Sequence, residues 1–310
     1  MTRSPAQERG FCHEAFFYAD EDEFLAGAVP FLEAGISSGE AVIAALPEPR
    51  RELLRGALGP LADEVALFPM EEYGRNPGRL IAAWRCFLRT NAEAPGVRGI
   101  GEPAHPGRSA AELEECERHE RLVNLVFAQE KALTVICPYD TSALDDDVLA
   151  AAQRSHSHCG SPEGKSASPH FTLDGLLEGS LPQPDRPTVS LGFGRTDLRT
   201  VRQAVASLAR SVGLSSRRNE DFVLAVCEAA TNSIQHGGGE GSLAIWRDGE
   251  RLVCDVRDAG RITDPLVGRE RPPADQVGGR GLWIANELCD LVQIRSGEQG
   301  THVRLRMEID

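Results

Sequence analysis

The stretch Glu228-Ala-Ala-Thr-Asn232-Ser-Ile-Gln-His236 decides how the last third of this chain folds. Residues four apart lie on one stripe of an α-helix, so Glu228, Asn232 and His236 share a polar stripe. The opposite stripe is apolar and is expected to face a sheet; it consists of Phe222, Ala225, Val226, Ala229 and Ala230. An asparagine oxygen suits Mg²⁺, and a carboxylate one turn away can polarise a nucleophile.

Two glycine-containing motifs follow this helix. Asp258-Ala-Gly260 comes directly after an expected strand, where a carboxylate can accept a hydrogen bond from an exocyclic amine. The glycine lets a ring approach the backbone. Gly278-Gly279-Arg280-Gly281-Leu282 opens a further helix, and the amides at a helix N-terminus bind phosphate groups. Each motif alone is common, but all three in this order are far more specific.

The elements around these motifs predict an α+β domain. Helices are expected over 198–212, 217–236 and 279–289, and the strand pairs 243–258 and 291–307 read as hairpins. The turn Asp248-Gly249 is a strong hairpin signal. We expect helices on one face of a mixed, mainly antiparallel sheet.

These motifs resemble those of a known superfamily. Residues 196–307 are similar to the GHKL ATPase domain shared by gyrase, heat-shock-90 chaperones, histidine kinases and mismatch-repair proteins. Within it they resemble the anti-sigma factor/serine kinase branch. Residues 228–236 match its N box, 258–260 its G1 box and 279–281 its G2 box. Thr301 matches the threonine on its penultimate strand.

The resemblance implies a Bergerat-type fold that binds ATP and Mg²⁺. Glu228 would be the general base, Asn232 the Mg²⁺ ligand and Asp258 the residue that binds the adenine amine. A lid would span residues 264–278. The residues that the resemblance places around the nucleotide are Asn232, His236, Asp258, Gly260, Gly279, Arg280, Gly281, Leu282 and Thr301.

The implied activity is phosphoryl transfer from ATP to a serine or threonine of a partner protein, as a signal-transduction step in transcription regulation. The implied partners are a sigma factor, an anti-sigma-factor antagonist, or both, and a homodimer is a family expectation. Many relatives continue the G1 box with a second glycine, where this chain has Arg261-Ile262. This departure leaves open an ATP-gated binding module without turnover. A sensor histidine kinase that uses His119 is a third reading, although no paired dimerisation helices precede the ATPase-like region.

The first half of the chain alternates expected strands and helices, which predicts a mainly parallel sheet covered on both faces. Ser109 is a candidate N-cap, with Glu112 three residues later. This half resembles the MEDS sensory domain, which implies a RecA-like α/β fold without a phosphate loop and a sensing role. The matching stretches are His13 with Phe17-Tyr18, residues 32–40, Glu117 to Asn124, residues 137–140 and His156.

The interval between the two halves is rich in serine, proline and glycine, which disfavours compact folding. We therefore predict a sensory domain over 11–159, a flexible linker over 160–194 and an ATP-binding domain over 195–310. A net charge of −14 argues against direct binding to nucleic acid or an anionic membrane. The sequence shows neither a signal peptide nor a membrane span, so a cytoplasmic protein is expected.

The eight cysteines are scattered, and a cytoplasmic protein keeps such thiols reduced. Cys116 and His119 are one helical turn apart, and Cys12, His13 and Cys137 lie in the same domain, which leaves a metal or haem site open, although their spacing is poor for one. The chain has no C-x₂-C pair, so the favoured interpretation is buried cysteines and surface or capping histidines. Redox sensing through Cys137 or Cys12 also stays open.

Overall fold

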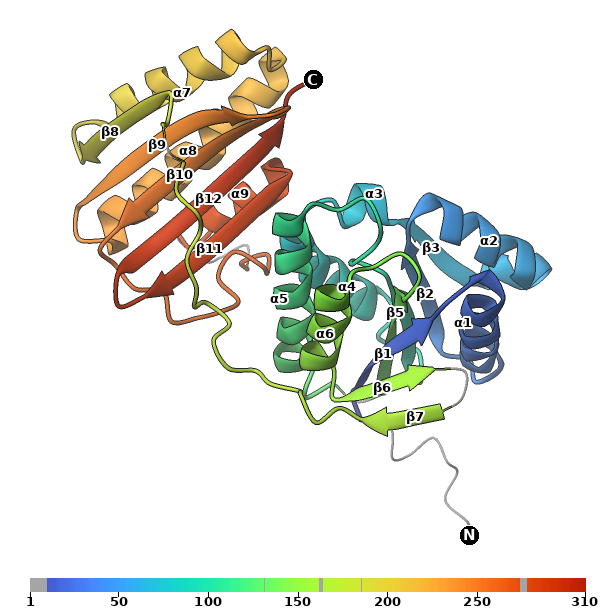
Figure 1. Ribbon diagram of the computed structural model, residues 1–310. Helices are drawn as coiled ribbons and strands as arrows, with labels where there is room; N and C mark the ends of the chain where they lie inside the picture. Colours follow the sequence, from blue (N-terminus) through green and yellow to red (C-terminus); the bar gives the residue numbers. More distant parts are fainter. Residues whose placement is uncertain (1–9, 131, 162–163, 185, 274–277) are drawn as a thin grey trace. The chain divides into compact units, whose positions relative to one another are not determined.

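The computed structural model describes residues 10–130, 132–161, 164–184, 186–273 and 278–310 (Figure 1). The chain divides after Asp174 into two compact units. Each unit has its own sheet and its own hydrophobic core. None of the helices formed by the described residues has both the length and the apolar character that a bilayer-spanning segment needs.

The first unit contains a seven-stranded sheet in the order β3-β2-β4-β5-β1-β6-β7. In this order, neighbouring strands from β3 through β1 to β6 are parallel. Only the edge strand β7 is antiparallel, and it pairs with β6. The strands are β1 (Cys12–Tyr18), β2 (Ala41–Leu46), β3 (Val65–Pro69), β4 (Val97–Gly101), β5 (Leu133–Asp140), β6 (His158–Ser161) and β7 (Gly164–Ala167). The α-helices are α1 (Glu21–Ser37), α2 (Glu48–Leu58), α3 (Met70–Tyr73), α4 (Leu80–Thr90), α5 (Ala110–Val126) and α6 (Asp146–Ser155), and the 3₁₀ helices are η2 (Gly59–Glu64) and η3 (Pro77–Arg79).

Helices cover both faces of this sheet, as the alternating sequence predicted. Side chains from α1 and α2, such as Phe24 and Leu54, form one core layer with Val42 and Leu46 of β2. Residues from α4, α5 and α6 form the other layer, which includes Ile43 of the same strand. Successive strand residues point to opposite faces, so β2 supplies both layers. Helix α5 also begins where the sequence predicted, because Ser109 is its N-cap and forms a capping box with Glu112.

The second unit contains a five-stranded sheet in the order β11-β12-β10-β9-β8. All four pairings are antiparallel, so the sheet is not mixed as the sequence had suggested. The elements are β8 (Val189–Gly194), α7 (Leu198–Val212), α8 (Ser216–His236), β9 (Glu240–Asp248), β10 (Arg251–Asp258), α9 (Gly281–Leu288), β11 (Leu291–Gly297) and β12 (Gly300–Glu308). The three helices lie on one face of the sheet (Figure 1).

The interval 160–194, for which a flexible linker is expected, contains two strands in the structure. Strand β7 pairs with β6, and β8 pairs with β9 at the edge of the second sheet. Between them, the chain crosses the sheet face that the helices leave uncovered (Figure 1). Leu181 is buried there, and the Pro182 carbonyl accepts a hydrogen bond from Arg304 at 2.6 Å. Edge strands and a single anchoring leucine need little apolar sequence, so composition alone did not reveal them.

Asp255 forms a buried ion-pair network on that same sheet face. Its two carboxylate oxygens accept hydrogen bonds from the Arg304 guanidinium at 2.6 and 2.8 Å, and the His302 ring lies 2.9 Å away. Burial opposes the charge of Asp255, but the bonds from Arg304 and His302 outweigh it and lower its pKa to about 2. Arg304 also lies over the ring of Trp246.

We expect Asp255→Ala to destabilise the second unit by about 3–5 kcal/mol, because it leaves the Arg304 charge buried and unpaired. Chemical denaturation followed by circular dichroism measures this loss. Glu220→Ala, an exposed change on α8, is the control and should stay within about 0.5 kcal/mol of wild type. Equal stability of the two variants would show that the network does not support the fold.

Candidate functional site

Helix α8 carries the first motif on a half-buried stripe. Its opposite stripe is buried in the core of the second unit through Phe222, Val226 and Ala230. This packing fixes the rotation of the helix, so Glu228 and Asn232 face away from the sheet. Neither side chain makes a hydrogen bond or ion pair with any other described residue. Their polar atoms are therefore available to a ligand.

The Asp258 carboxylate is held at the end of β10 by two hydrogen bonds. Ser233 donates its hydroxyl to Oδ2 at 2.6 Å, and the Gly260 amide donates to Oδ1 at 2.8 Å. Gly260 packs directly on the end of α8, where an added Cβ would lie 2.6 Å from the His236 carbonyl oxygen. Only glycine fits this close approach, which sets the position of the loop after β10.

The glycine motif before α9 brings backbone amides to Glu228 and Asn232. Gly278 and Gly279 have positive φ angles of 86° and 74°, which glycine adopts without strain. A Cβ on Gly281, the first residue of α9, would lie 2.8 Å from Glu228 Oε2 and 3.1 Å from Asn232 Nδ2. The N-terminus of α9 therefore adjoins the polar stripe of α8. Such a terminus favours negative charge.

These three motifs surround a cleft of about 310 Å³ in the second unit, a size typical of small-molecule sites. Glu228 lies beside it through its contact with Gly281. The predicted site residues that line the cleft are Asn232, His236, Asp258, Gly260, Gly279, Gly281, Leu282 and Thr301. Arg280, like Glu228, does not line the cleft, and its guanidinium donates to the Pro273 carbonyl at 3.0 Å.

Thr301 supports the wall of the cleft through its hydroxyl. That hydroxyl donates to the Gly260 carbonyl at 2.9 Å and lies 2.9 Å from the Ser296 hydroxyl. Ser296 in turn accepts a hydrogen bond from the Ile262 amide at 2.8 Å. Sequence reasoning did not single out Ser296, which has no motif of its own. Arg261 lines the cleft from the same loop.

The predicted lid, residues 264–278, is described only in part. Its first portion is anchored, since Asn286 of α9 donates to the Gly268 carbonyl at 3.0 Å. Val267 lines the cleft and packs on the core. Residues 274–277 lie outside the described residues.

Comparison with known protein families assigns both units. A model of the methanogen/methylotroph, DcmR sensory (MEDS) domain matches residues 12–157, and a model of the histidine kinase-like ATPase domain matches residues 195–307. The chain joins a MEDS domain to a histidine kinase-like ATPase domain. Both resemblances seen in the sequence are confirmed.

Individual relatives match the ATPase domain. The serine-protein kinase RsbW of Halalkalibacterium halodurans is 29% identical over 125 residues, which are 36% of this chain and 77% of RsbW. A crystal structure of the RsbU and RsbW domains of Rv1364c from Mycobacterium tuberculosis aligns at 22% identity with a TM-score of 0.28. That alignment covers 40% of this chain and 33% of the other. A TM-score this low supports no conclusion about the fold or function of this chain.

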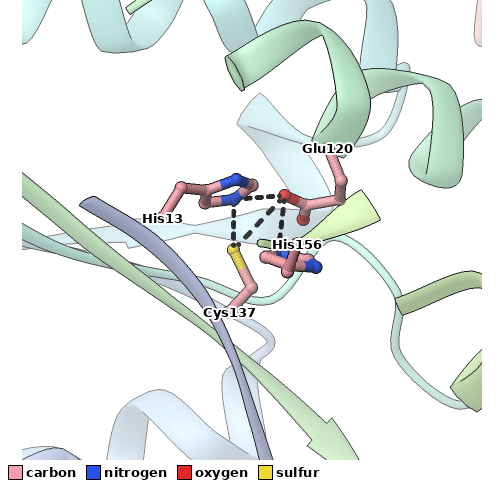
Figure 2. A group of neighbouring side chains, drawn as sticks. All are labelled: His13, Glu120, Cys137 and His156. Carbon is pink, nitrogen blue, oxygen red and sulfur yellow. Dashed lines mark hydrogen bonds and ion pairs between the residues drawn. The ribbon is translucent and has the colours of Figure 1, made fainter. Parts of the chain in front are cut away.

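The MEDS domain holds a buried polar cluster of His13, Glu120, Cys137 and His156 (Figure 2). All four residues lie in stretches that match the MEDS domain, Glu120 within 117–124, but the sequence analysis did not group them into one site. Burial alone would raise the pKa of Glu120, yet its interactions with the rings of His13 and His156 hold that pKa well below its usual value. Burial and then the Glu120 charge raise the pKa of Cys137 well above that of a free thiol. A thiol that stays protonated is a poor redox nucleophile.

The other sulfur and histidine candidates lie apart from this cluster. Cys116 donates its thiol to the Pro103 carbonyl at 3.2 Å. His119 is only 2% exposed within α5, so it is not presented as a phosphoacceptor. All eight cysteines are free; four are buried, three are half-buried and Cys86 is exposed.

Proposed function

We propose that the ATPase domain binds ATP with Mg²⁺ and transfers a phosphoryl group to a serine or threonine of a partner protein, under control of the MEDS domain. The name of the RsbW relative, a serine-protein kinase, supports the kinase activity. The resemblance of the sequence motifs to the anti-sigma factor/serine kinase branch implies that the partner is a sigma factor or an anti-sigma-factor antagonist. The observation that carries this proposal is the N-terminus of α9 packed against Glu228 and Asn232.

The residues of the cleft fit the groups of ATP·Mg²⁺. The Asp258 carboxylate is fixed where it can accept a hydrogen bond from the adenine amine, and the amides before α9 can hold phosphate oxygens. Asn232 would ligate Mg²⁺ through its amide oxygen, which has no competing partner among the described residues. Bound Mg²⁺ would offset the negative charge of the phosphates.

Glu228 would act on the hydroxyl group of the partner. Its uncommitted carboxylate lies beside Gly281, at the phosphate-binding end of the cleft. From there it can orient the serine or threonine hydroxyl and accept its proton as the phosphoryl group transfers.

A second candidate function is favoured by Arg261. This side chain lines the cleft at the position where many relatives have glycine, and its charge can hold phosphate without helping transfer. The domain would then capture its partner in an ATP-dependent way with negligible turnover.

Binding of a fluorescent ATP analogue, with and without Mg²⁺, tests the nucleotide site. We expect Mg²⁺-dependent binding by the full chain, and a loss of about tenfold or more in affinity for Asn232→Ala, which is at least 1.4 kcal/mol. Gln235→Ala, an exposed change on the same helix, is the matched control. Absence of binding by folded wild type would refute both candidate functions.

A further inference from the structure

The cluster of His13, Glu120, Cys137 and His156 gathers four metal-ligand side chains from four places in the MEDS fold. They come from β1, α5, β5 and the residue after α6. Each of the four residues is at most 2% exposed. Figure 2 shows all four side chains pointing toward a common centre. Burying this many polar atoms together is costly unless each finds a partner.

The donor atoms of this cluster lie close to one another, most of them slightly closer than the ligands of a tetrahedral ion. Glu120 Oε2 lies 2.8 Å from His13 Nε2, 3.3 Å from Cys137 Sγ and 3.5 Å from His156 Nε2. The distance from His13 Nε2 to Cys137 Sγ is 3.3 Å. An ion with bonds of about 2.1 Å to nitrogen and oxygen and about 2.3 Å to sulfur sets its ligands about 3.4–3.7 Å apart. Small side-chain shifts would therefore admit an ion.

Hydrogen bonds outside the cluster fix the tautomer of both histidines. His156 Nδ1 lies 2.8 Å from the Ala152 carbonyl oxygen, which can only accept, so Nδ1 carries a proton. The Asn124 amide nitrogen donates to the Glu120 and Ser155 carbonyls, which leaves its oxygen to accept from His13 Nδ1 at 3.2 Å. Both Nε2 atoms then face the cluster with a lone pair when the rings are neutral. Metal-binding histidines are commonly oriented in this way.

Internal hydrogen bonds do not satisfy the whole cluster. Among the described residues, His156 Nε2 and Glu120 Oε1 are buried without a hydrogen-bond partner. One proton can be shared between His13 Nε2 and Glu120. The lone pair of His156 Nε2 then still faces the Glu120 carboxylate with no proton between them. A cation at the centre would engage both ring nitrogens and the carboxylate at once.

We propose that the MEDS domain binds one Zn²⁺ ion through His13, Glu120, Cys137 and His156. Two imidazoles, a carboxylate and a thiolate form a donor set that suits Zn²⁺. On binding, the four ligand atoms form bonds to the ion, and the thiol proton and the proton between His13 and Glu120 leave to solvent. The two anionic ligands then balance the charge of the ion. The adjoining cavity is only about 10 Å³, which admits at most one water molecule and no porphyrin.

Titration of the full chain with Co²⁺ tests this site, after removal of metal with a chelator and without a histidine affinity tag. We expect one Co²⁺ per chain, the intense visible bands of tetrahedral Co²⁺ and a thiolate-to-cobalt charge-transfer band. Added Zn²⁺ should displace Co²⁺ and raise the thermal midpoint of unfolding. No uptake of either metal by folded wild type would overturn the proposal.

Two variants and one matched control assign the ligands. Cys137→Ser should remove the charge-transfer band, and His156→Gln should lower metal affinity at least about tenfold. Cys116→Ser changes another buried thiol of the same domain outside the cluster, and it should bind as wild type does. Persistence of the charge-transfer band in Cys137→Ser would place the metal elsewhere and overturn the assignment.

A second measurement needs no variant, in case Cys137→Ser does not fold. X-ray absorption of the zinc-loaded wild type should show one sulfur at about 2.3 Å and three nitrogen or oxygen neighbours at about 2.0–2.2 Å. A first shell without sulfur would contradict the site.

Discussion

Asp258→Asn is expected to lower the affinity of the ATPase domain for ATP by about 100-fold or more. The amide oxygen of asparagine would have to accept the hydrogen bond that the Gly260 amide now gives to Oδ1. The amide NH₂ would then replace Oδ2 and face the adenine amine, so two donors would meet. A binding site that forms a hydrogen bond with one polar group of its ligand loses much of its affinity when that hydrogen bond cannot form. Equilibrium binding of ATP by calorimetry measures the effect.

Base selectivity provides an independent readout of the same change. Guanine presents a carbonyl oxygen where adenine presents its amine, so wild type should bind ATP far more tightly than GTP. Asp258→Asn should reduce the difference in affinity between ATP and GTP. Asp248→Asn is the control, because it is exposed and Asn-Gly suits the same hairpin turn. Unchanged ATP affinity in a folded Asp258→Asn protein would show that this carboxylate does not contact the base.

Much of the ATPase domain could be predicted because its signals are local. The spacing of Glu228, Asn232 and His236 fixes one helix stripe, and Asp248-Gly249 fixes a hairpin. The glycines at 278–281 mark the turn into α9. Local patterns also indicated the alternating strands and helices of the first unit.

Features that depend on distant pairing were not predictable. Strand β8 and the crossing segment near Leu181 owe their order to β9 and to the sheet face, not to their own composition. The hydrogen-bond partners of the Thr301 hydroxyl, which are the Gly260 carbonyl and Ser296, were likewise not predicted. The hydrogen-bond partner of a hydroxyl group cannot be predicted from the residues next to it in the sequence.

The metal-ligand cluster shows the same limit more strongly. His13 and Cys137 are separated by 124 positions, and only the parallel pairing of β1 with β5 brings them close. Glu120 stands among charged residues that resemble an exposed helix face, yet it is 1% exposed. Its burial follows from the position of α5 over the sheet, which no local pattern in the helix reveals.

Glu228→Ala separates the two candidate functions of the ATPase domain. If Glu228 accepts the proton of the attacking hydroxyl, its removal should slow phosphoryl transfer by about 10²–10⁴-fold. ATP affinity should change by less than about threefold, because Glu228 lies beside the cleft and the base-binding and phosphate-binding groups remain. Single-turnover formation of ADP from radiolabelled ATP, with the protein in excess, measures the step with water as the acceptor.

The carboxylate itself is tested by Glu228→Gln, which keeps the size of the side chain near Gly281 but cannot take up a proton. It should be as slow as Glu228→Ala if proton transfer matters, and nearly as fast as wild type if Glu228 only fills space. Glu220→Ala on the exposed side of the same helix should leave the rate unchanged. Wild-type protein that binds ATP but forms no ADP, either with water or with an anti-sigma-factor antagonist as the acceptor, would refute the kinase proposal. The ATP-gated binding module would then remain, in which Arg261 holds phosphate and the occupied cleft presents the binding surface.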